Sequence, residues 1–405
     1  MTTVPLVPPV EFPGDPGLSG ASRLFDGEWV WQAYCNEFGR PEFDAHQIRV
    51  RHFNHSPGRG AIVSYALEWP PDAYLPPELF TVRILRAKPV ELFRYPEDAQ
   101  LPGLKNAARP DTALRLVNKH VFVIPVRRVS VDVVRYRPGS RAVLRHGVGK
   151  VTFYVRVLRP VRVAPLLAAA DLVARSEFVA PRLAGDWKDG GVLWFSEIPG
   201  RNLRRHIQRG KLPDPALLLD GLESLWNMPH RNDSGRAFDL KGPYRRAKRI
   251  FTHALQGSEE GRRSLKDAAL SLDHFVETWR PVCHAHNDFY DDQMLALPDG
   301  RLALVDFEEL GPGDPMLDVG NFLAHLRWTS RFGPNRYASV RDTYRRLFQS
   351  AALERFHWDK HELALREAVC LFRMGTSAIR HIRHDWRSRL QAGLSLVNEI
   401  SREAA

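Results

Sequence analysis

The chain has 405 residues, enough for two domains or for one two-lobed domain with an extension. Hydrophobic residues make up 44% of it and charged residues 26%, as in an ordinary globular protein, and no run approaches the roughly 20 apolar residues of a membrane helix. The formal net charge is +11, but basic residues are spread along the chain with no basic helix of interleaved aromatics, which favours a solvated basic surface over a nucleic-acid partner.

The three cysteines, Cys35, Cys283 and Cys370, are far apart and odd in number. They form neither a disulfide framework nor a CxxC site, so the sequence predicts a reducing, cytoplasmic location. Residues 1–20 contain several prolines and lack the basic start and apolar run of a signal peptide. We therefore expect a disordered leader over this stretch.

An N-terminal extension or cap is expected over residues 21–118. Its first part, 21–44, has the apolar spacing of a helix. Alternating apolar residues then predict strands, and the dipeptide Pro57-Gly58 predicts a turn between the first two of them. These expected strands are 48–53, 61–65 and 80–85. A loop and a short helix follow over 96–118.

A β-rich N-lobe is expected over 119–197 and a mainly helical C-lobe over 198–405. Alternation returns after residue 128, and a segment rich in alanine and leucine over 164–175 predicts a helix. The expected strands of the N-lobe are 129–136, 142–144, 151–158 and 191–197. We therefore predict an α+β fold with two lobes that meet near residue 197.

Two stretches of the extension and the N-lobe are similar to each other. PGRGAIV at 57–63 parallels PGSRAVL at 138–144, and FTVRIL at 80–85 parallels FYVRVL at 153–158. An internal duplication would explain the likeness, and so would two generic hairpins that match by chance.

The residues that point to a function lie around another predicted hairpin. Apolar runs at 294–297 and 302–305 flank a Pro-Asp-Gly turn. In such a hairpin, the residue that opens the first strand lies beside the residue that ends the second, so Gln293 and Asp306 come together. Asp288 lies in the loop that leads to the same edge. The sequence therefore predicts a cluster of side-chain oxygens.

This cluster suits phosphoryl transfer. Carboxylate and carboxamide oxygens are the ligands that Mg²⁺ prefers, with water and substrate phosphates completing its shell. Phosphoryl transfer also needs a carboxylate that holds the acceptor hydroxyl beside the metal–phosphate complex. Asp288, Gln293 and Asp306 together supply both.

The segment resembles the aminoglycoside phosphotransferases and choline-type kinases. HNDFYDDQ at 286–293 is similar to their HxDxxxxN, VDFE at 305–308 to their IDFE, and GDPMLDVG at 313–320 to their GDPxxDLA. Upstream, RYRPGSR at 135–141 is similar to the first hairpin of some members, and LWFSEIPG at 193–200 to the strand that meets adenine. The resemblance implies a bilobal, protein-kinase-like fold.

The resemblance also implies a role for each matching residue of the C-lobe. Asp288 would be the catalytic base that orients the acceptor hydroxyl. Asp306 and Gln293 would bind the Mg²⁺ that bridges the phosphates of ATP. His286 and Asp318 would support the catalytic loop. Asp314 would brace the same loop.

Four residues upstream are implied to bind ATP, the expected cofactor. Glu197 and Ile198 would offer backbone groups to adenine, and Gly139 is the one glycine of a thin phosphate loop. Arg156 stands where a kinase has its phosphate-binding lysine; arginine can grip phosphate with two N–H groups but is bulkier. Gln293 is a second departure, because the family has asparagine there.

A kinase pairs that lysine with a glutamate of the next helix. The helix at 164–175 contains Asp171 and no glutamate, and Glu177 lies just beyond it. A longer base, Arg156, paired with a shorter acid is one hypothesis that fits these lengths.

Other residues of the same regions have alternative interpretations. His284 and His286 could share a strand face in a zinc hydrolase, but the later histidines lie in helical stretches. Asp291 and Asp292 are expected to be loop residues and not metal ligands. Some C-terminal residues are expected to be ordinary core and surface positions, with an acceptor-pocket wall as the alternative: Trp328, Phe372, His381, His384 and Trp386.

We predict an ATP- and Mg²⁺-dependent small-molecule kinase. It would transfer the γ-phosphoryl group to a hydroxyl of a small polar acceptor such as an aminoglycoside, an amino alcohol or a sugar. Arg156 and Gln293 motivate the alternative, a pseudokinase that binds ligand or acts as a scaffold without transfer. The sequence does not name the acceptor, the oligomeric state or the role of residues 21–118.

Overall fold

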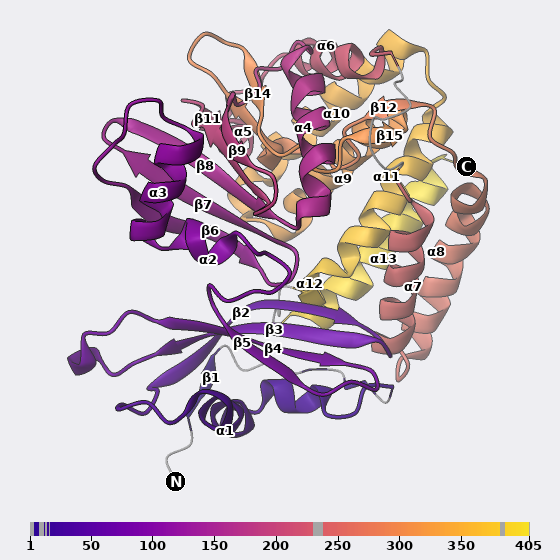
Figure 1. Cartoon of the computed structure of the whole chain (residues 1–405). Helices are drawn as coiled ribbons and strands as arrows, with labels where there is room; N and C mark the ends of the chain where they lie inside the picture. The colour runs from indigo at the N-terminus through magenta and orange to yellow at the C-terminus, as the bar shows by residue number, and fades with distance from the viewer. Residues whose placement is uncertain are drawn as a thin grey trace.

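The computed structural model describes residues 4–7, 12, 14–15, 17–229, 238–380 and 385–404. Two five-stranded sheets and a group of long helices build the described chain (Figure 1). The first sheet, from the extension, lies at one end of the molecule, and the second lies beside the helices that carry the catalytic segment.

The first sheet has the strand order β1-β2-β3-β4-β5. Its pairings are antiparallel except for β1, which runs parallel to β2. Helix α1 (Gly27–Phe38) packs on this sheet through Val30, Trp31 and Tyr34, and it begins at Asp26, whose carboxylate accepts two backbone N–H groups. The strands are β1 (Leu6–Val7), β2 (Gln47–Ser56), β3 (Gly60–Glu68), β4 (Glu78–Leu85) and β5 (Glu91–Arg94).

Where the sequence led us to expect a disordered leader over 1–20, the described residues pack on the first sheet. β1 adds an edge strand, and Val4 and Leu18 are buried. An edge strand tolerates neighbouring prolines, because the missing N–H faces no partner strand. The remaining residues of the stretch lie outside the described part of the chain.

The second sheet has the order β6-β7-β8-β10-β9. Val155 and Trp194 on one face share a core with α2 (Leu104–Ala108) and α3 (Pro110–His120), whereas Leu193 and Phe195 on the other face pack toward α4 (Val163–Ala174). The strands are β6 (Ser130–Arg137), β7 (Arg141–Val148), β8 (Val151–Leu158), β9 (Leu183–Trp187) and β10 (Val192–Ser196). From the sequence we placed α2 and α3 in the extension, whereas they pack on the second sheet. The domain boundaries at residues 118 and 197 stay predictions.

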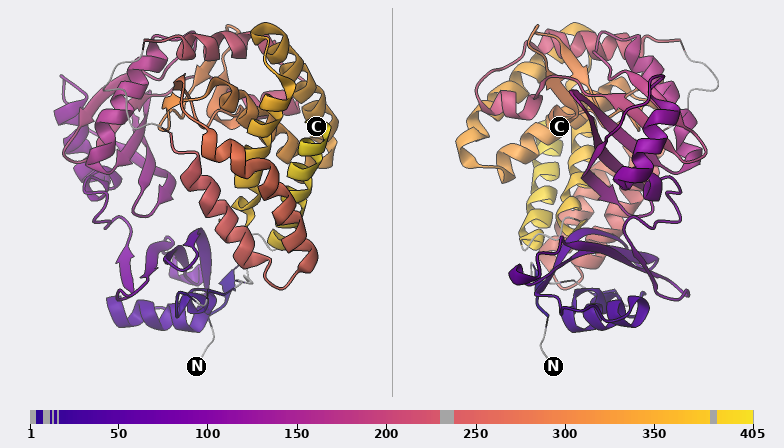
Figure 2. Two further views of the ribbon diagram at one scale, coloured as in Figure 1. Left: turned by 90° about the vertical axis from the view of Figure 1, so that its right-hand side faces the viewer. Right: turned by 60° about the vertical axis from the view of Figure 1, so that its left-hand side comes forward.

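Helices dominate the rest of the chain (Figure 2). They are α5 (Leu203–Gln208), α6 (Pro215–Trp226), α7 (Lys241–Ala254), α8 (Glu259–Thr278), α9 (Pro315–Phe332), α10 (Ala338–Phe356), α11 (Lys360–Gly375), α12 (Ser377–Arg380) and α13 (Trp386–Ala404). Residues of α7, α8, α11 and α13 share one hydrophobic core with the first sheet, so the extension is docked on the helical lobe. None of the described helices has both the length and the apolar character needed to cross a bilayer.

Two small sheets interrupt the helices and shape the catalytic segment. One contains β11 (Arg201–Asn202), β13 (Met294–Ala296) and β14 (Leu302–Leu304), and the other pairs β12 (Cys283–Ala285) with β15 (Gly311–Gly313).

The extension and the N-lobe repeat one structural unit, in which β2-β3-β4 corresponds to β6-β7-β8. Gly58 and Gly139, in the first turn of each unit, both have a φ of 66°, a conformation that glycine adopts without strain. The N–H of Gly58 donates to the carboxylate of Asp15 at 2.8 Å, and the N–H of Gly139 donates to Asp98 at 2.7 Å.

The likeness continues before the strands. Both aspartates begin similar segments, DPGLSG at 15–20 and DAQLPG at 98–103. In each segment the backbone N–H of the leucine three residues on, Leu18 or Leu101, donates to the carbonyl of the aspartate. A shared turn clamp on top of the shared strand pattern favours duplication over a chance match of hairpins.

The clamp of the first unit contains a buried histidine. The side chains of His55 and Asp15 are each 3% exposed, and Nε2 of His55 lies 2.8 Å from Oδ2 of Asp15. Burial lowers the pKa of His55, and the contact with Asp15 does not fully offset that shift. Burial would raise the pKa of Asp15, but hydrogen bonds from Gly58, His55 and Gly17 outweigh it and leave this pKa below its ordinary value.

A pH dependence of stability follows from these two shifts. Both folded pKa values lie below the ordinary ones, so the stability that these groups contribute is present at neutral pH and is lost on acidification, beginning near the ordinary histidine pKa of about 6.5. We expect the free energy of unfolding, measured with urea, to fall more between about pH 7.5 and about pH 5.5 in the wild type than in His55→Gln. Glutamine keeps a donor for Asp15 but does not titrate; parallel pH profiles would contradict this assignment.

Candidate active site

A buried carboxylate holds the loop that carries Asp288. Asp318, in the first turn of α9, accepts the backbone N–H groups of His286 at 2.8 Å and Asn287 at 2.7 Å, and the indole N–H of Trp226 at 3.1 Å. Burial raises the pKa of Asp318 to about 7, and these three donors oppose that shift. Asp318 therefore holds the backbone of the catalytic loop, which is the supporting role that the family resemblance implies for it.

The backbone turns sharply immediately before Asp288. Asn287 has a φ of 66°, and its side-chain amide donates to the carbonyl oxygens of Glu309 at 3.0 Å and Gly311 at 3.3 Å. Asparagine tolerates this left-handed conformation better than most residues. These bonds tie the catalytic loop to the segment that follows β14.

Asp314 fixes the start of α9. Its Oδ1 accepts the backbone N–H of Met316 at 2.9 Å, and its Oδ2 accepts the indole N–H of Trp279 and the guanidinium of Arg366, each at 3.0 Å. The carboxylate thus caps the helix from which Asp318 reaches the loop.

The predicted hairpin forms and brings three polar side chains together. Met294 pairs with Leu304, and the N–H of Val305 donates to the carbonyl of Gln293 at 3.0 Å. The side-chain amide of Gln293 donates to Oδ2 of Asp288 at 3.2 Å. Asp288, Gln293 and Asp306 line one cavity of about 110 Å³, the juxtaposition that the hairpin geometry predicts.

The two aspartates of this cavity differ in proton affinity. Burial raises the pKa of Asp288 to about 7, and the nearby charges of Asp306 and Glu309 add to that effect. Burial would also raise the pKa of Asp306, but the guanidinium groups of Arg156 and Arg141 outweigh it and lower this pKa. Asp306 therefore stays ionised, and Asp288 has the proton affinity of a base that works near neutral pH.

Arg156 bonds to a residue that the sequence analysis did not single out. Its Nη1 lies 3.0 Å from Oε1 of Glu308, and its Nη2 donates to the carbonyl of Val305 at 2.9 Å. The hypothesis of a pair with the shorter acid, Asp171, is wrong, since Asp171 instead binds Arg175 at 2.7 Å. Only the folded chain brings Arg156 and Glu308 together, because 152 positions separate them.

Three further arginines of the N-lobe line the same cavity: Arg135, Arg137 and Arg141. Arg137 and Arg141 are paired residues on either side of the turn that contains Gly139. Arg141 also bonds to Glu308 and lies 3.8 Å from Asp306. The alternation of Arg135 and Arg137, which places both on one strand face, was a signal that could have identified them.

The other residues implied to bind nucleotide lie around this sheet. The N–H of Gly139 is directed to Asp98, so the turn presents its flanking arginines to the cavity. Glu197 and Ile198 follow β10, and the N–H of Glu197 donates to the carbonyl of Thr152 at 3.1 Å. The N–H of Glu197 is therefore engaged within the sheet.

Asp291 and Asp292 both bind Arg204. Asp291 is 1% exposed and lies 2.9 Å from Nη2 of Arg204, while Asp292 lies 3.2 Å from Nη1. Above this ion pair, Tyr290 stacks on His325 with ring centres 3.8 Å apart. Asp291 is thus a buried structural partner and not the solvated loop residue that the sequence suggested.

His284 and His286 are both buried, and His286 lines the cavity. No group of three or more His, Cys, Asp and Glu side chains placed to hold a metal occurs within the described ranges. Trp328, Phe372 and Trp386 are buried in the hydrophobic core that α7, α8, α11 and α13 share, as expected. His381 and His384 lie outside the described residues.

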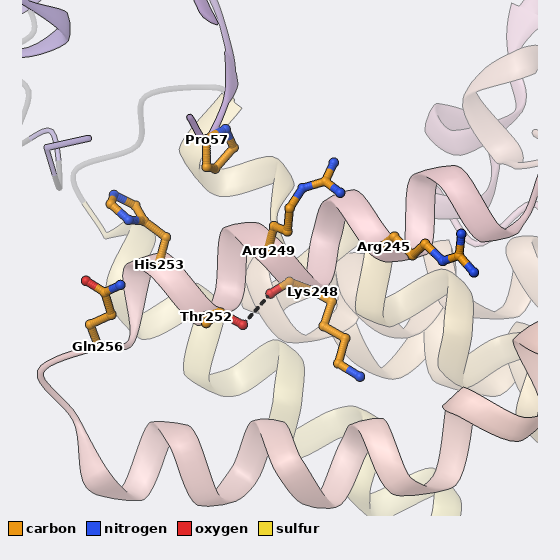
Figure 3. A pocket seen from close by; sticks show the side chains of 7 residues that line it. All are labelled: Pro57, Arg245, Lys248, Arg249, Thr252, His253 and Gln256. Atoms are coloured by element: carbon orange, nitrogen blue, oxygen red, sulfur yellow. Dashed lines mark hydrogen bonds between the residues drawn. The ribbon is translucent and has the colours of Figure 1, made fainter. Parts of the chain in front are cut away.

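A larger, shallower hollow of about 450 Å³ lies between the turn at Pro57 and α7 (Figure 3). Its basic side chains are largely engaged with α8. Arg245 binds Glu277 at 2.7 Å, and Lys248 binds Asp273 at 2.9 Å. We therefore place the candidate site in the smaller cavity, where carboxylates and arginines converge.

Comparison with known proteins identifies the family. Residues 129–363 match the family described as the phosphotransferase enzyme family, APH. No curated protein matches the chain.

Solved structures share the fold. A choline kinase from Cryptosporidium parvum superposes with a TM-score of 0.51 at 12% identity, covering 72% of this chain and 95% of that one. The AMP-bound complex of spectinomycin phosphotransferase APH(9)-Ia gives a TM-score of 0.50 at 10% identity, covering 73% of this chain and 98% of that one. The predicted α+β, bilobal, kinase-like fold is confirmed. Because the family match extends over more than half of the sequence, this chain belongs to the phosphotransferase enzyme family.

Proposed function

We propose that this phosphotransferase uses ATP and Mg²⁺ to phosphorylate a hydroxyl group of a small polar molecule. One observation carries the proposal: Asp288, Gln293 and Asp306 share a small cavity with arginines from the opposite lobe. A base, oxygen ligands for a metal, and cations for phosphates are the parts that phosphoryl transfer needs.

Asp288 is the proposed base. Its carboxylate lines the cavity, and Gln293 holds one of its oxygens at 3.2 Å. The elevated pKa of about 7 suits a group that accepts a hydroxyl proton near neutral pH. In this role Asp288 orients the acceptor hydroxyl toward the γ-phosphate and takes its proton as the new P–O bond forms, while the bond between the γ-phosphorus and the β–γ bridging oxygen breaks and ADP leaves.

Asp306 and Gln293 fit a magnesium site. Arg156 and Arg141 lie 3.7 and 3.8 Å from the Asp306 carboxylate, beyond hydrogen-bond length, and no described residue donates a hydrogen bond to it. Its oxygens therefore keep lone pairs for a cation. Gln293 donates its N–H to Asp288, which leaves its amide oxygen as the metal-binding end. When bound, Mg²⁺ would offset the negative charge of the transferring phosphate.

The N-lobe arginines are the proposed phosphate contacts. Arg137 and Arg141 flank the turn at Gly139 and line the cavity, and Arg156 is held beside them by Glu308. Arginine binds phosphate oxygens in pairs and keeps its charge at every physiological pH. Adenine would lie at Glu197 and Ile198, with His286 and Asp318 supporting the catalytic loop.

The proposed acceptor is a small hydroxyl compound. Two acids of the helical lobe are engaged within the protein and are not offered as its contacts: Glu367 binds Arg327 at 2.7 Å, and Asp314 binds Arg366 at 3.0 Å. We also propose a cytoplasmic enzyme, which the three free cysteines support.

We expect Mg²⁺-dependent binding of ATP and loss of transfer in two variants. ATP with Mg²⁺ at about 100 times its dissociation constant should stabilise the wild type by about 2.7 kcal/mol, seen as a rise in the thermal midpoint that ATP with EDTA does not reproduce. Asp288→Asn should still show this rise but lose at least about a hundredfold in kcat with any accepted substrate. Asp306→Asn should lose the Mg²⁺ dependence of binding as well as transfer.

Asp299→Asn is the matched control for both variants, because Asp299 lies in the turn of the same hairpin and its side chain is 51% exposed beside Arg301. Normal transfer by Asp288→Asn and Asp306→Asn would refute the proposed roles. Absence of any nucleotide effect on the wild type would leave the pseudokinase alternative as the better account.

The bonds of Arg156 predict that lysine is not an equivalent at this position. Arg156 reaches Glu308 and the carbonyl of Val305 through two different nitrogens, whereas lysine has only one. We expect Arg156→Lys to raise the KM for ATP about tenfold, since a bond of a charged group to a buried partner is worth about 1.5–3 kcal/mol. Arg145→Lys, a change on neighbouring β7 at a half-exposed ion pair with Asp132, should have little effect. A gain of activity in Arg156→Lys would instead indicate a weakened kinase site.

A further inference from the structure

A buried aspartate lies behind the turn that presents the N-lobe arginines. Asp98 is 7% exposed and belongs to the segment that links the first sheet to α2. Its Oδ2 accepts the backbone N–H of Gly139 at 2.7 Å and the phenol O–H of Tyr136 at 2.9 Å, and its Oδ1 accepts the N–H of Gln100 at 3.0 Å. These three donors supply the hydrogen bonds that the Asp98 carboxylate needs, because it has almost no contact with water.

These bonds determine what the turn can offer to a phosphate. In a glycine-rich loop, backbone N–H groups point at the phosphates. Here the N–H of Gly139 is engaged by Asp98, so the side chains on either side of the turn have to supply the contacts. Arg137 and Arg141 are opposite each other in the strand register and both line the cavity. Their separation and direction depend on the conformation of the turn between them.

The linking segment is itself held at several points. Tyr95 packs on Tyr136 with ring centres 5.1 Å apart, and the N–H of Gly103 donates to the carbonyl of Gly190 at 3.0 Å. Leu101 and Leu104 are buried in the core of the second sheet. Asp98 therefore acts from a fixed support and not from a loose loop.

We propose that Asp98 is a positioning residue for nucleotide binding: it holds the turn at Gly139 so that Arg137 and Arg141 meet the phosphates of ATP. This inference rests on the proposed function of the cavity. It gives the segment that links the first sheet to α2 a part in the nucleotide site, although no atom of Asp98 lines that site.

The repeated unit of the extension supplies a matched control within the same chain. Asp15 accepts the N–H of Gly58 at 2.8 Å, a ring nitrogen of His55 lies 2.8 Å from the same oxygen, and the N–H of Gly17 donates to the other oxygen at 3.0 Å. This is the bonding pattern of Asp98. The turn of the first unit contains Arg59, but Ser56 and Gly60, which hold the places of Arg137 and Arg141, carry no cation. Loss of Asp15 or of Asp98 removes the same kind of clamp from a glycine turn. Only the clamp of Asp98 lies behind the cavity-lining arginines, Arg137 and Arg141.

The test is the dissociation constant of Mg²⁺-ATP, measured calorimetrically on the full chain, for wild type, Asp98→Ala and Asp15→Ala. We expect Asp98→Ala to bind about tenfold more weakly, because a released turn holds the binding geometry for only a fraction of the time and the apparent affinity falls by that fraction. Asp15→Ala should bind within about twofold of wild type, even where its thermal midpoint is lower. Where an acceptor is known, Asp98→Ala should raise the KM for ATP and leave kcat largely unchanged.

Asp98→Asn keeps one neutral acceptor and should restore part of the affinity, to about threefold weaker than wild type. If Asp98→Ala does not fold, this variant decides the question. Unchanged or tighter binding in the Asp98 variants would overturn the inference, and so would equal weakening by Asp15→Ala, which would indicate general destabilisation. A wild type that binds no nucleotide would refute the proposed function itself, whereas a binding wild type with unaffected Asp98 variants refutes only this inference.

Discussion

The contact of Glu308 with two arginines fixes the cleft on which the rest of the site depends. Glu308 follows the hairpin of the C-lobe, and Arg141 and Arg156 come from two neighbouring strands of the N-lobe. Its side chain is only 8% exposed, so the charges have lost most of their contact with water. Removing one partner from such a buried ion pair typically costs about 3–5 kcal/mol, because the remaining charge is left uncompensated. The two lobes therefore have little freedom to separate at this point, and Asp306, two residues before Glu308, is held facing the arginines.

The same arrangement explains how two buried aspartates of one cavity acquire opposite properties. Burial disfavours the charged form of both. Asp306 lies close to Arg156 and Arg141, which restore its charge. At Asp288 burial is the dominant effect on the pKa, the charge of Arg373 opposes it, and those of Asp306 and Glu309 add to it. A permanently ionised group suits a metal, and a group that titrates near pH 7 suits a proton acceptor. The roles proposed for the two residues thus follow from their neighbours, although the residues themselves are chemically identical.

The parts of the site that could be predicted from sequence are those that depend on short-range geometry. The hairpin that unites Gln293 and Asp306 follows from two apolar runs and a Pro-Asp-Gly turn, and Asp318 lies one turn into a helix that Asp314 caps. Contacts between distant segments were not predictable. Arg156 was matched with nearby acids of its own lobe, whereas its partner lies 152 positions away; Asp291 looked like a solvated loop residue until the fold placed Arg204 against it. Local patterns specify elements, but the choice among many possible ion pairs depends on how those elements pack.

The repeated unit shows how one scaffold can have a chemical use in one position and a structural use in another. Both units clamp a glycine turn with an aspartate, and both have an arginine in the third strand, Arg83 or Arg156. In the extension, Arg83 binds Glu91 of the adjacent strand, so its charge is satisfied within its own sheet. Gly60 occupies the place that Arg141 has in the second unit, and a Cβ there would lie 2.9 Å from the carbonyl oxygen of Ile84, so no side chain fits without a shift. The first unit therefore cannot present a cation at the place of Arg141, and its sheet joins the hydrophobic core of the helical lobe. Through that core the extension is fixed to the helical lobe, and the segment that carries Asp98 runs from its last strand to α2.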